Sequence, residues 1–195
     1  NAVTWSGRPD PALLGPRPKA GLKTWLMTRL RVEALCEALM KIALAQTNPI
    51  VGALSKNVKR MIEVTRSAQS LSCRLVVCPE LSSTGYPPKD HLEKADFVDA
   101  NLRAFQSLVD SVRDVAVVCG YVGRNRSTEG KALFNSAALF EGGKILHQVQ
   151  KCLLPSYDVF EETRYFEPGP LPEAVAFEGV RIGISICEDI WNDKD

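Results

Sequence analysis

The sequence predicts a layered domain of the α+β class, in which helices pack against a mixed sheet. From Met40 onward, short apolar runs of strand length alternate with segments of helical periodicity. Two of the apolar runs are joined by a tight glycine turn, which indicates a hairpin. Of the 195 residues, 45% are hydrophobic and 24% are charged, which is typical of a globular protein able to bury a substantial core.

The first half of this domain is expected to supply three strands and two helices. Strands are predicted at residues 41–46, 75–78 and 115–121, where aliphatic side chains follow one another. A second helix is expected over 97–112, where apolar residues recur with helical spacing. The first helix follows the Asn48-Pro49 turn and shows one apolar face, made by Val58, Met61, Ile62 and Thr65.

The second half is expected to contribute a hairpin and a further strand. Residues 134–140 and 145–150 flank the turn Glu141-Gly-Gly-Lys144, so they are predicted to pair antiparallel. Another strand is expected at 180–186, running directly into Cys187. The hairpin and the mixed order of elements favour the α+β class.

Residues 1–39 differ in composition and are expected to form an N-terminal extension outside the domain, which would span 40–195. Four of the twelve prolines lie in the first eighteen residues, and residues 1–39 carry six basic and three acidic side chains. The alternative is a partner-binding or targeting helix over 22–39. Because the chain starts at Asn1 and stops at Asp195 just after a strand and turn, we expect a fragment at both ends.

Several classes of protein do not fit this sequence. Twenty-four basic and 23 acidic residues give a net charge of +1, which removes the electrostatic case for nucleic-acid binding. We find no 18-residue apolar run of the kind that spans a membrane. The six cysteines form no C-x-x-C pair and the two histidines lie far apart, so no metal site is expected. Thiols beside apolar runs favour a reducing, cytoplasmic location over a disulfide framework.

Three reactive side chains follow predicted strands, where rigid elements can aim them. They are Glu80, Lys151 and Cys187. Together they could perform acyl transfer: the thiolate attacks a carbonyl, the carboxylate moves the proton, and the ammonium opposes charge on the carbonyl oxygen. Each also has an ordinary interpretation, as a buried structural thiol, a solvated turn residue or a solvated charge.

Five segments, in order, resemble the nitrilase (carbon–nitrogen hydrolase) superfamily, and more closely the N-terminal glutaminase domains of glutamine-dependent NAD synthetases. Together they cover nearly everything after residue 40. The runs Thr84-Gly-Tyr-Pro-Pro88 and Cys187-Glu-Asp-Ile-Trp191 favour the NAD synthetase branch. The five segments start at Lys41, Cys78, Leu133, Lys151 and Ile186 and end at Gly52, Pro88, Ala138, Phe166 and Trp191.

The resemblance implies a role for each catalytic position. It implies Glu80 as general base, Lys151 as the cation that stabilises the oxyanion, and Cys187 as nucleophile. Glu162 matches the family's accessory glutamate, which supports the lysine and orients substrate. A lysine held between two glutamates would stay protonated despite burial, because the opposite charges offset the loss of hydration.

The resemblance also implies a substrate pocket and a fold. Tyr86 and Tyr157 match tyrosines that line the glutamine pocket, and the backbone N–H of Glu188 is expected as a second oxyanion donor. The family fold is a four-layer α-β-β-α sandwich, which is expected to be incomplete on the C-terminal side of this chain. Family members assemble into oligomers through the helical layer, so a homo-oligomer is expected.

The same resemblance predicts a larger reaction. Glutamine would be hydrolysed through a cysteine thioester, and the ammonia would serve ATP-dependent amidation of nicotinic acid adenine dinucleotide to NAD. The synthetase domain is absent from this chain, and we see no Gly-x-x-x-x-Gly-Lys-Ser/Thr motif. We therefore expect no cofactor in this fragment, and we expect ATP and magnesium to be used by the missing domain.

Two other hypotheses remain open at this point. The chain could belong to a free-standing amidase or carbamoylase of the same superfamily, which would not respond to ATP. It could also be an inactive fragment that cannot close its core, in which case exposed sheet edges would favour aggregation.

Overall fold

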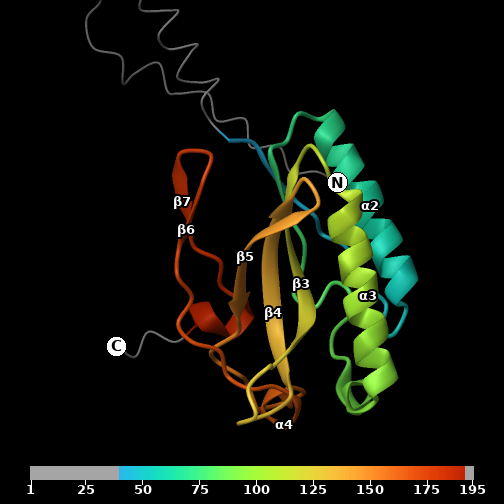
Figure 1. The fold of residues 1–195 in the computed structure, drawn as a ribbon, viewed down its shortest axis with the longest axis vertical. Helices are drawn as coiled ribbons and strands as arrows, with labels where there is room; N and C mark the ends of the chain where they lie inside the picture. The colour runs from blue at the N-terminus through green and yellow to red at the C-terminus, as the bar shows by residue number, and fades with distance from the viewer. Residues whose placement is uncertain (1–39, 192–195) are drawn as a thin grey trace, which may run out of the picture. The chain divides into compact units, whose positions relative to one another are not determined.

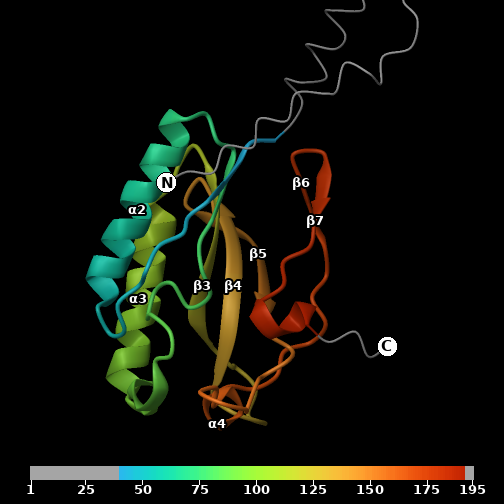
Figure 2. The same cartoon turned by 180° about the vertical axis from the view of Figure 1, so that it is seen from behind.

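The computed structural model describes residues 40–191, which form layers around a mixed sheet. Helices α2 (Leu54–Ser70) and α3 (Ala95–Ser111) lie side by side on one face of the sheet (Figure 1). A two-stranded sheet of β6 (Val175–Phe177) and β7 (Val180–Ile182) lies on the opposite side, as the view from behind also shows (Figure 2).

The main sheet has five strands in sequence order. Strands β1, β2 and β3 run parallel, whereas β4 is antiparallel to both of its neighbours. Because β4 alone is reversed, the carboxyl ends of β2 and β5 lie at the same end of the sheet. The strands are β1 (Ile42–Leu44), β2 (Leu75–Val77), β3 (Ala116–Arg124), β4 (Leu133–Glu141) and β5 (Lys144–Gln150).

The central strands β3 and β4 are apolar on both faces because both faces are covered. One set of alternating side chains packs against the two helices, with the ring of Phe105 stacked on that of Tyr121 at 3.9 Å between centroids. The other set, including Ala116, Val118 and Leu139, packs beneath the β6–β7 layer. The cavity beside Glu80 and Cys187, described below, opens on this second face.

The predicted strands of the main sheet and the predicted helix at 97–112 are confirmed, with small shifts at their ends. The prediction of a strand over 180–186 is wrong beyond Ile182, where β7 ends. Beyond that point Ile184 and Ile186 are buried against the sheet, so burial rather than strand pairing holds them. The sequence patterns also missed β6 and three short helices, namely η2 (Lys89–Glu93), α4 (Glu162–Tyr165) and η3 (Cys187–Ile190).

The cysteines of the described part of the chain are unpaired thiols. Cys73, Cys78 and Cys119 are buried, and burial raises the pKa of the Cys78 thiol to about 12. These three thiols therefore act as small apolar groups. The extension expected at 1–39 lies outside the described residues, and within 40–191 no helix has the length and apolarity needed to cross a bilayer.

Candidate active site

Glu80 lies in a loop that both helices hold against the sheet. The buried Asn57 of α2 donates from Nδ2 to the carbonyl of Ser83 at 3.1 Å. The Ser83 hydroxyl donates to Oδ1 of Asn101 in α3 at 2.6 Å. Because these partners are buried, the loop after β2 has little conformational freedom. The Glu80 side chain is therefore held in a fixed position.

A glycine in β3 lets the Glu80 loop cross the sheet. A Cβ added at Gly120 would lie 2.4 Å from the backbone nitrogen of Leu81 and 2.9 Å from Cα of Glu80. The loop therefore rests directly on the backbone of β3, and Leu81 adopts a left-handed conformation with φ of 44°. In this way Glu80, which follows β2, reaches a lysine that follows β5.

Lys151 is fully buried and lies between two carboxylates. Its Nζ is 2.8 Å from Oε1 of Glu80 and 2.8 Å from Oε1 of Glu162. Lys151 comes directly after β5, whereas Glu162 is the first residue of α4. The three side chains, which are far apart in sequence, form one ionic network at the end of the sheet.

Asn135 of β4 is a fourth member of this network that the sequence patterns did not single out. Its Nδ2 donates to Glu80 Oε1 at 2.6 Å and to Glu162 Oε2 at 3.3 Å, and its carbonyl accepts from the Lys151 amide at 2.8 Å. Asn135 is fully buried. A polar residue at an inward position of a buried strand was the signal that could have found it.

The network fixes the protonation of its members. Burial lowers the pKa of Lys151, but hydrogen bonds from its ammonium to Glu162 and Glu80 outweigh this and leave the pKa raised. Burial raises the pKa of Glu162, and Lys151 counteracts this only in part. Lys151 is thus held as a cation and can supply positive charge without giving up its proton.

Cys187 lies at a sharp turn close to Glu80. It opens η3 with φ of 46°, a left-handed conformation uncommon for a residue with a side chain. Its thiol is exposed. Desolvation and then the charge of Glu80 raise the pKa of the thiol, whereas Lys151 lowers it. The thiol therefore stays protonated at neutral pH and needs a base to become a nucleophile.

The two predicted tyrosines hold different glutamates of this site. The Tyr86 hydroxyl donates to Glu162 Oε1 at 2.8 Å, and the Tyr157 hydroxyl donates to Glu188 Oε2 at 2.9 Å. The ring of Phe160 lies between them, 6.2 Å from Tyr86 and 5.4 Å from Tyr157 between centroids. Tyr157 is 56% exposed, so this side of the site forms its outer rim.

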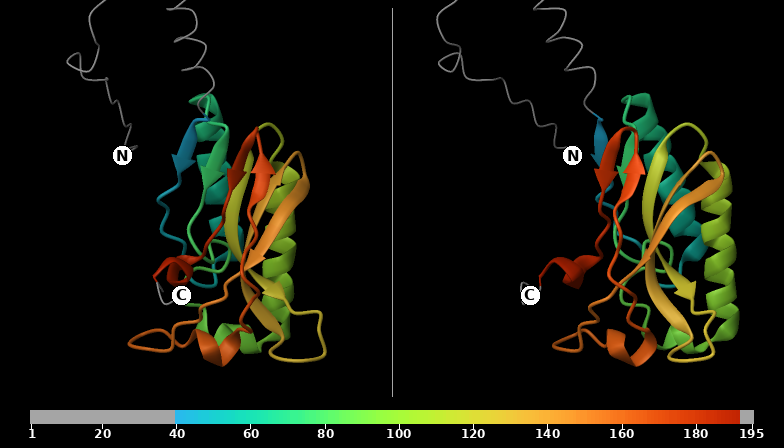
Figure 3. Two further views of the ribbon diagram at one scale, coloured as in Figure 1. Left: turned by 90° about the vertical axis from the view of Figure 1, so that its left-hand side faces the viewer. Right: turned by 60° about the vertical axis from the view of Figure 1, so that its left-hand side comes forward.

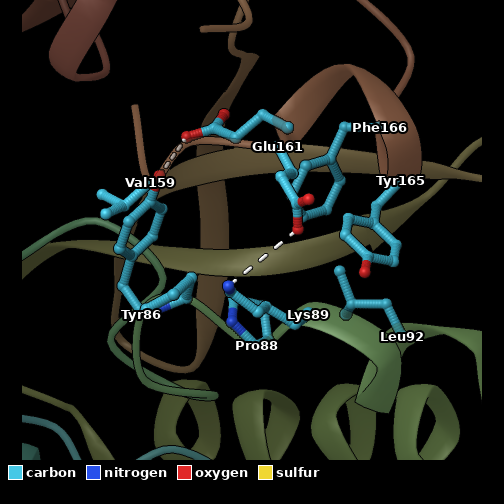
Figure 4. Close-up of a pocket in the computed structure, with 10 residues that line it drawn as sticks. Tyr86, Pro88, Lys89, Leu92, Val159, Glu161, Tyr165 and Phe166 are labelled. Atoms are coloured by element: carbon cyan, nitrogen blue, oxygen red, sulfur yellow. Dashed lines mark hydrogen bonds and ion pairs between the residues drawn. The ribbon is translucent and has the colours of Figure 1, made fainter. Parts of the chain in front are cut away.

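A small hollow behind Tyr86 is too tight for a substrate. Figure 4 shows Tyr86, Pro88 and Tyr165 around it, with Lys89 paired to Glu161 at 4.0 Å. Its volume is about 20 Å³, which is room for about one water molecule. A larger cavity of about 370 Å³ opens beside Glu80 and Cys187, and its other walls are mainly apolar residues of β1, β2 and the segment after β7.

The structure brings together every residue singled out from the sequence as a candidate for chemistry. Glu80, Lys151 and Glu162 are in direct contact, and Cys187 lies near enough to Glu80 and Lys151 for both charges to shift its pKa. Within residues 40–191, no three His, Cys, Asp or Glu side chains gather as a metal site.

A thiol beside a carboxylate and a buried ammonium, on a layered sheet, is an arrangement that can perform acyl transfer, and it points to the hydrolases. The sequence identifies the family within that class. Residues 41–195 match the carbon–nitrogen hydrolase family, and the chain belongs to it.

Curated relatives are similar over most of this chain. A glutamine-dependent NAD(+) synthetase of Synechocystis sp. is 41% identical over 157 residues, and one of Acinetobacter baylyi is 40% identical over 152 residues. In each case 78% of this chain is covered. The chain spans only 28% and 27% of the length of these two relatives.

Solved structures share the fold. Glutamine-dependent NAD+ synthetase from Acinetobacter baumannii matches with a TM-score of 0.72 and 35% identity, over 78% of this chain and 28% of that one. An amidase from Nesterenkonia sp. matches with a TM-score of 0.62 and 26% identity, over 76% of this chain and 55% of that one. The nitrilase-type fold expected from the sequence is thus confirmed.

Proposed function

We propose that this chain is the glutaminase part of a glutamine-dependent NAD synthetase. The observation that carries the proposal is the Glu80–Lys151–Glu162 network beside the thiol of Cys187. The similarity to NAD synthetases at 40–41% identity supports glutamine as the amide that is hydrolysed.

The first half of the reaction forms a thioester. Glu80 takes the proton of Cys187, and the thiolate attacks the side-chain amide carbon of glutamine. The ammonium of Lys151 and the backbone N–H of Glu188 stabilise the negative charge on the carbonyl oxygen. Glu80 then gives its proton to the departing nitrogen, ammonia leaves, and a γ-glutamyl thioester remains on Cys187.

The second half breaks the thioester. Glu80 takes a proton from a water molecule, and the hydroxide formed attacks the thioester carbon. Lys151 opposes the negative charge on the oxygen a second time. The proton returns from Glu80 to the sulfur, glutamate leaves, and the thiol of Cys187 is restored.

The remaining residues hold the lysine and the substrate. Glu162 keeps Lys151 protonated, and Tyr86 holds Glu162 through the 2.8 Å hydrogen bond. At the rim, the carboxylate of Glu188 held by Tyr157 offers negative charge that suits the ammonium of a free amino acid. Tyr86, Tyr157 and Glu188 are therefore proposed to bind glutamine.

The wider role of the whole protein is part of the same proposal. The ammonia would amidate nicotinic acid adenine dinucleotide to NAD in the cytoplasm, using ATP and magnesium bound by a synthetase domain outside this chain. Neither group is assigned to residues 40–191, where no cluster of metal-ligating side chains occurs. A homo-oligomer is proposed as the working form.

The test is Cys187→Ala in the full-length protein, with Cys152→Ala as the matched control. Cys152 is a partly exposed thiol next to Lys151 that the proposed chemistry does not use. We expect Cys187→Ala to abolish glutamine hydrolysis and glutamine-driven NAD synthesis, and to leave ammonia-driven synthesis intact. Cys152→Ala should retain all three activities. Glutamine-driven synthesis by Cys187→Ala would refute the assignment of the nucleophile.

A free-standing amidase is the second candidate, because an amidase from Nesterenkonia sp. shares the fold at 26% identity. An unmodified protein that hydrolyses simple amides but not glutamine, with no response to ATP, would favour this alternative. A third outcome is an inactive fragment, which a broad and non-cooperative thermal transition of the 195-residue chain would indicate.

A further inference from the structure

The carboxylate of Asp189 connects two separate segments of the site. Its Oδ1 accepts hydrogen bonds from the backbone nitrogens of Cys152 at 3.0 Å and Leu153 at 2.9 Å. Its Oδ2 accepts from the backbone nitrogen of Ile186 at 3.0 Å. One side chain therefore satisfies three backbone donors from two parts of the chain.

The positions of these donors make the connection specific to the site. Cys152 directly follows Lys151, and Ile186 directly precedes Cys187. The Asp189 carboxylate thus links the backbone directly after Lys151 to the backbone directly before Cys187. Figure 3 shows η3, which carries Asp189, at the same end of the sheet as the loop that follows β5.

Besides this connection, the Cys187 turn is held by the burial of Ile186 against the sheet and by the hydrogen bond between Tyr157 and Glu188. Strand pairing ends at Ile182, and Cys187 itself adopts the left-handed conformation with φ of 46°. An uncommon backbone conformation persists only where its surroundings enforce it. Hydrogen bonds from backbone N–H groups to a carboxylate are among the stronger ones in proteins, so three of them can enforce the turn.

The neighbouring carboxylate does not duplicate this role. Glu188 accepts a hydrogen bond from the hydroxyl of Tyr157 at the exposed rim. Asp189 instead accepts hydrogen bonds from the backbone N–H groups after Lys151 and before Cys187. The two adjacent acids therefore differ in what they hold.

We propose that Asp189 is a positioning residue that sets the distance and direction between the Cys187 thiol and the Lys151 ammonium. It touches neither the substrate nor the reacting atoms. The role of this distance in glutamine hydrolysis rests on the proposed function, whereas the tie between the two segments does not.

The test compares Asp189→Asn with the unmodified protein, and uses Asp110→Asn as the matched control. Asparagine keeps the size of the side chain, but its NH₂ group cannot accept from a backbone N–H, so one side of the tie is lost. Asp110 is an exposed acid of α3 that accepts from Gln106. Asp189→Ala removes both sides of the tie.

We expect kcat for glutamine to fall about 10²-fold in Asp189→Ala and less in Asp189→Asn, with KM within about twofold, because misplacement by about 1 Å costs this much. Asp110→Asn should not change kcat. If the Asp189 variants lose melting temperature but keep kcat within about twofold at 20 °C, the residue is only structural and the proposal is overturned.

A second measurement does not depend on glutamine. The rate of Cys187 alkylation by iodoacetamide, followed by mass spectrometry across pH, reports the surroundings of the thiol. A thiol released from its fixed surroundings should titrate closer to an ordinary cysteine, so the midpoint should fall in Asp189→Asn and fall further in Asp189→Ala, although the two variants remove the same charge. An unchanged midpoint would show that Asp189 does not position the Cys187 turn. A lower midpoint in a protein that does not hydrolyse glutamine would leave the tie standing and reject the proposed function.

Discussion

The ionic network and the Cys187 turn meet in one site but are built differently. Lys151 is fully buried and Glu162 is 4% exposed, and both contact residues of the main sheet or its loops. The Cys187 turn lies after the last paired strand, and Ile190 and Trp191, which follow it, are 68% and 73% exposed. The proposed base and cation are thus fixed by the core, whereas the proposed nucleophile depends on the burial of Ile186 and a few hydrogen bonds.

The difference has a consequence for the proposed chemistry. A buried cation between two carboxylates needs each of its partners in place, because an unpaired charge in the interior lowers stability strongly. A thiol at the edge is neutral until Glu80 takes its proton, so its segment can be held more lightly. Substitutions in the network should therefore harm stability and activity together, and those in the turn should harm activity first.

The largest effect is expected for Lys151→Met. Methionine cannot pair with Glu80 or Glu162, so the buried carboxylate of Glu162 would face the partly buried carboxylate of Glu80 with no cation between them. We expect the free energy of unfolding to fall by about 3–5 kcal/mol, as for other broken buried ion pairs. We also expect kcat to fall by about 10²–10³ from the loss of one oxyanion donor. Urea unfolding and a glutaminase assay measure the two effects.

The loss of stability in Lys151→Met should also depend on pH, and the direction of that dependence gives a second test. A proton on Glu162 can replace part of the missing positive charge, so the loss of stability should be smaller at pH 5 than at pH 8. Lys144→Met, an exposed lysine at the opposite end of β5, is the control and should change stability by no more than about 0.5 kcal/mol. A loss in Lys151→Met that is equal at both pH values would contradict the buried network.

Substitutions at two glycines, Gly120 and Gly183, test the difference between the network and the Cys187 turn, with a smaller expected effect than Lys151→Met. The added methyl of Gly120→Ala would meet the backbone of Glu80 and Leu81, so we expect a loss of about 1–3 kcal/mol in stability and about 10²-fold in kcat. Gly183, in the segment after β7, has no heavy atom within 4 Å of an added Cβ. Gly183→Ala should therefore leave stability and kcat close to the values of the unmodified protein. Equal losses in the two variants would contradict the proposed difference between the network and the Cys187 turn.

The smallest effect concerns the protonation of the nucleophile. Desolvation and then Glu80 raise the pKa of the Cys187 thiol, so its alkylation by iodoacetamide should have a midpoint above that of an ordinary cysteine. Glu80→Gln removes a negative charge that disfavours the thiolate, so the midpoint should move to lower pH even as glutamine hydrolysis is lost. A midpoint that rises in Glu80→Gln would show that Glu80 does not face the thiol.

The order of strands and helices could be predicted because local patterns carry it. Apolar runs predicted β2 and β3, and the Glu141–Lys144 turn predicted the hairpin of β4 and β5. The strand expected at 180–186 failed beyond Ile182, because apolar side chains look the same whether they pair in a sheet or are buried against one.

The sequence by itself determined the family and the candidate residues Glu80, Lys151, Glu162 and Cys187, because they lie in short segments whose order and spacing are characteristic. Beyond the pairing of Lys151 with the two glutamates, only the tertiary structure decided which groups hold these residues. Asn135 of β4 bonds Glu80 in the loop after β2, Gly120 of β3 leaves room for that loop, and Asp189 joins the Cys187 turn to the segment after β5. Such contacts depend on how distant segments meet in space, and the local pattern around a single residue does not specify that.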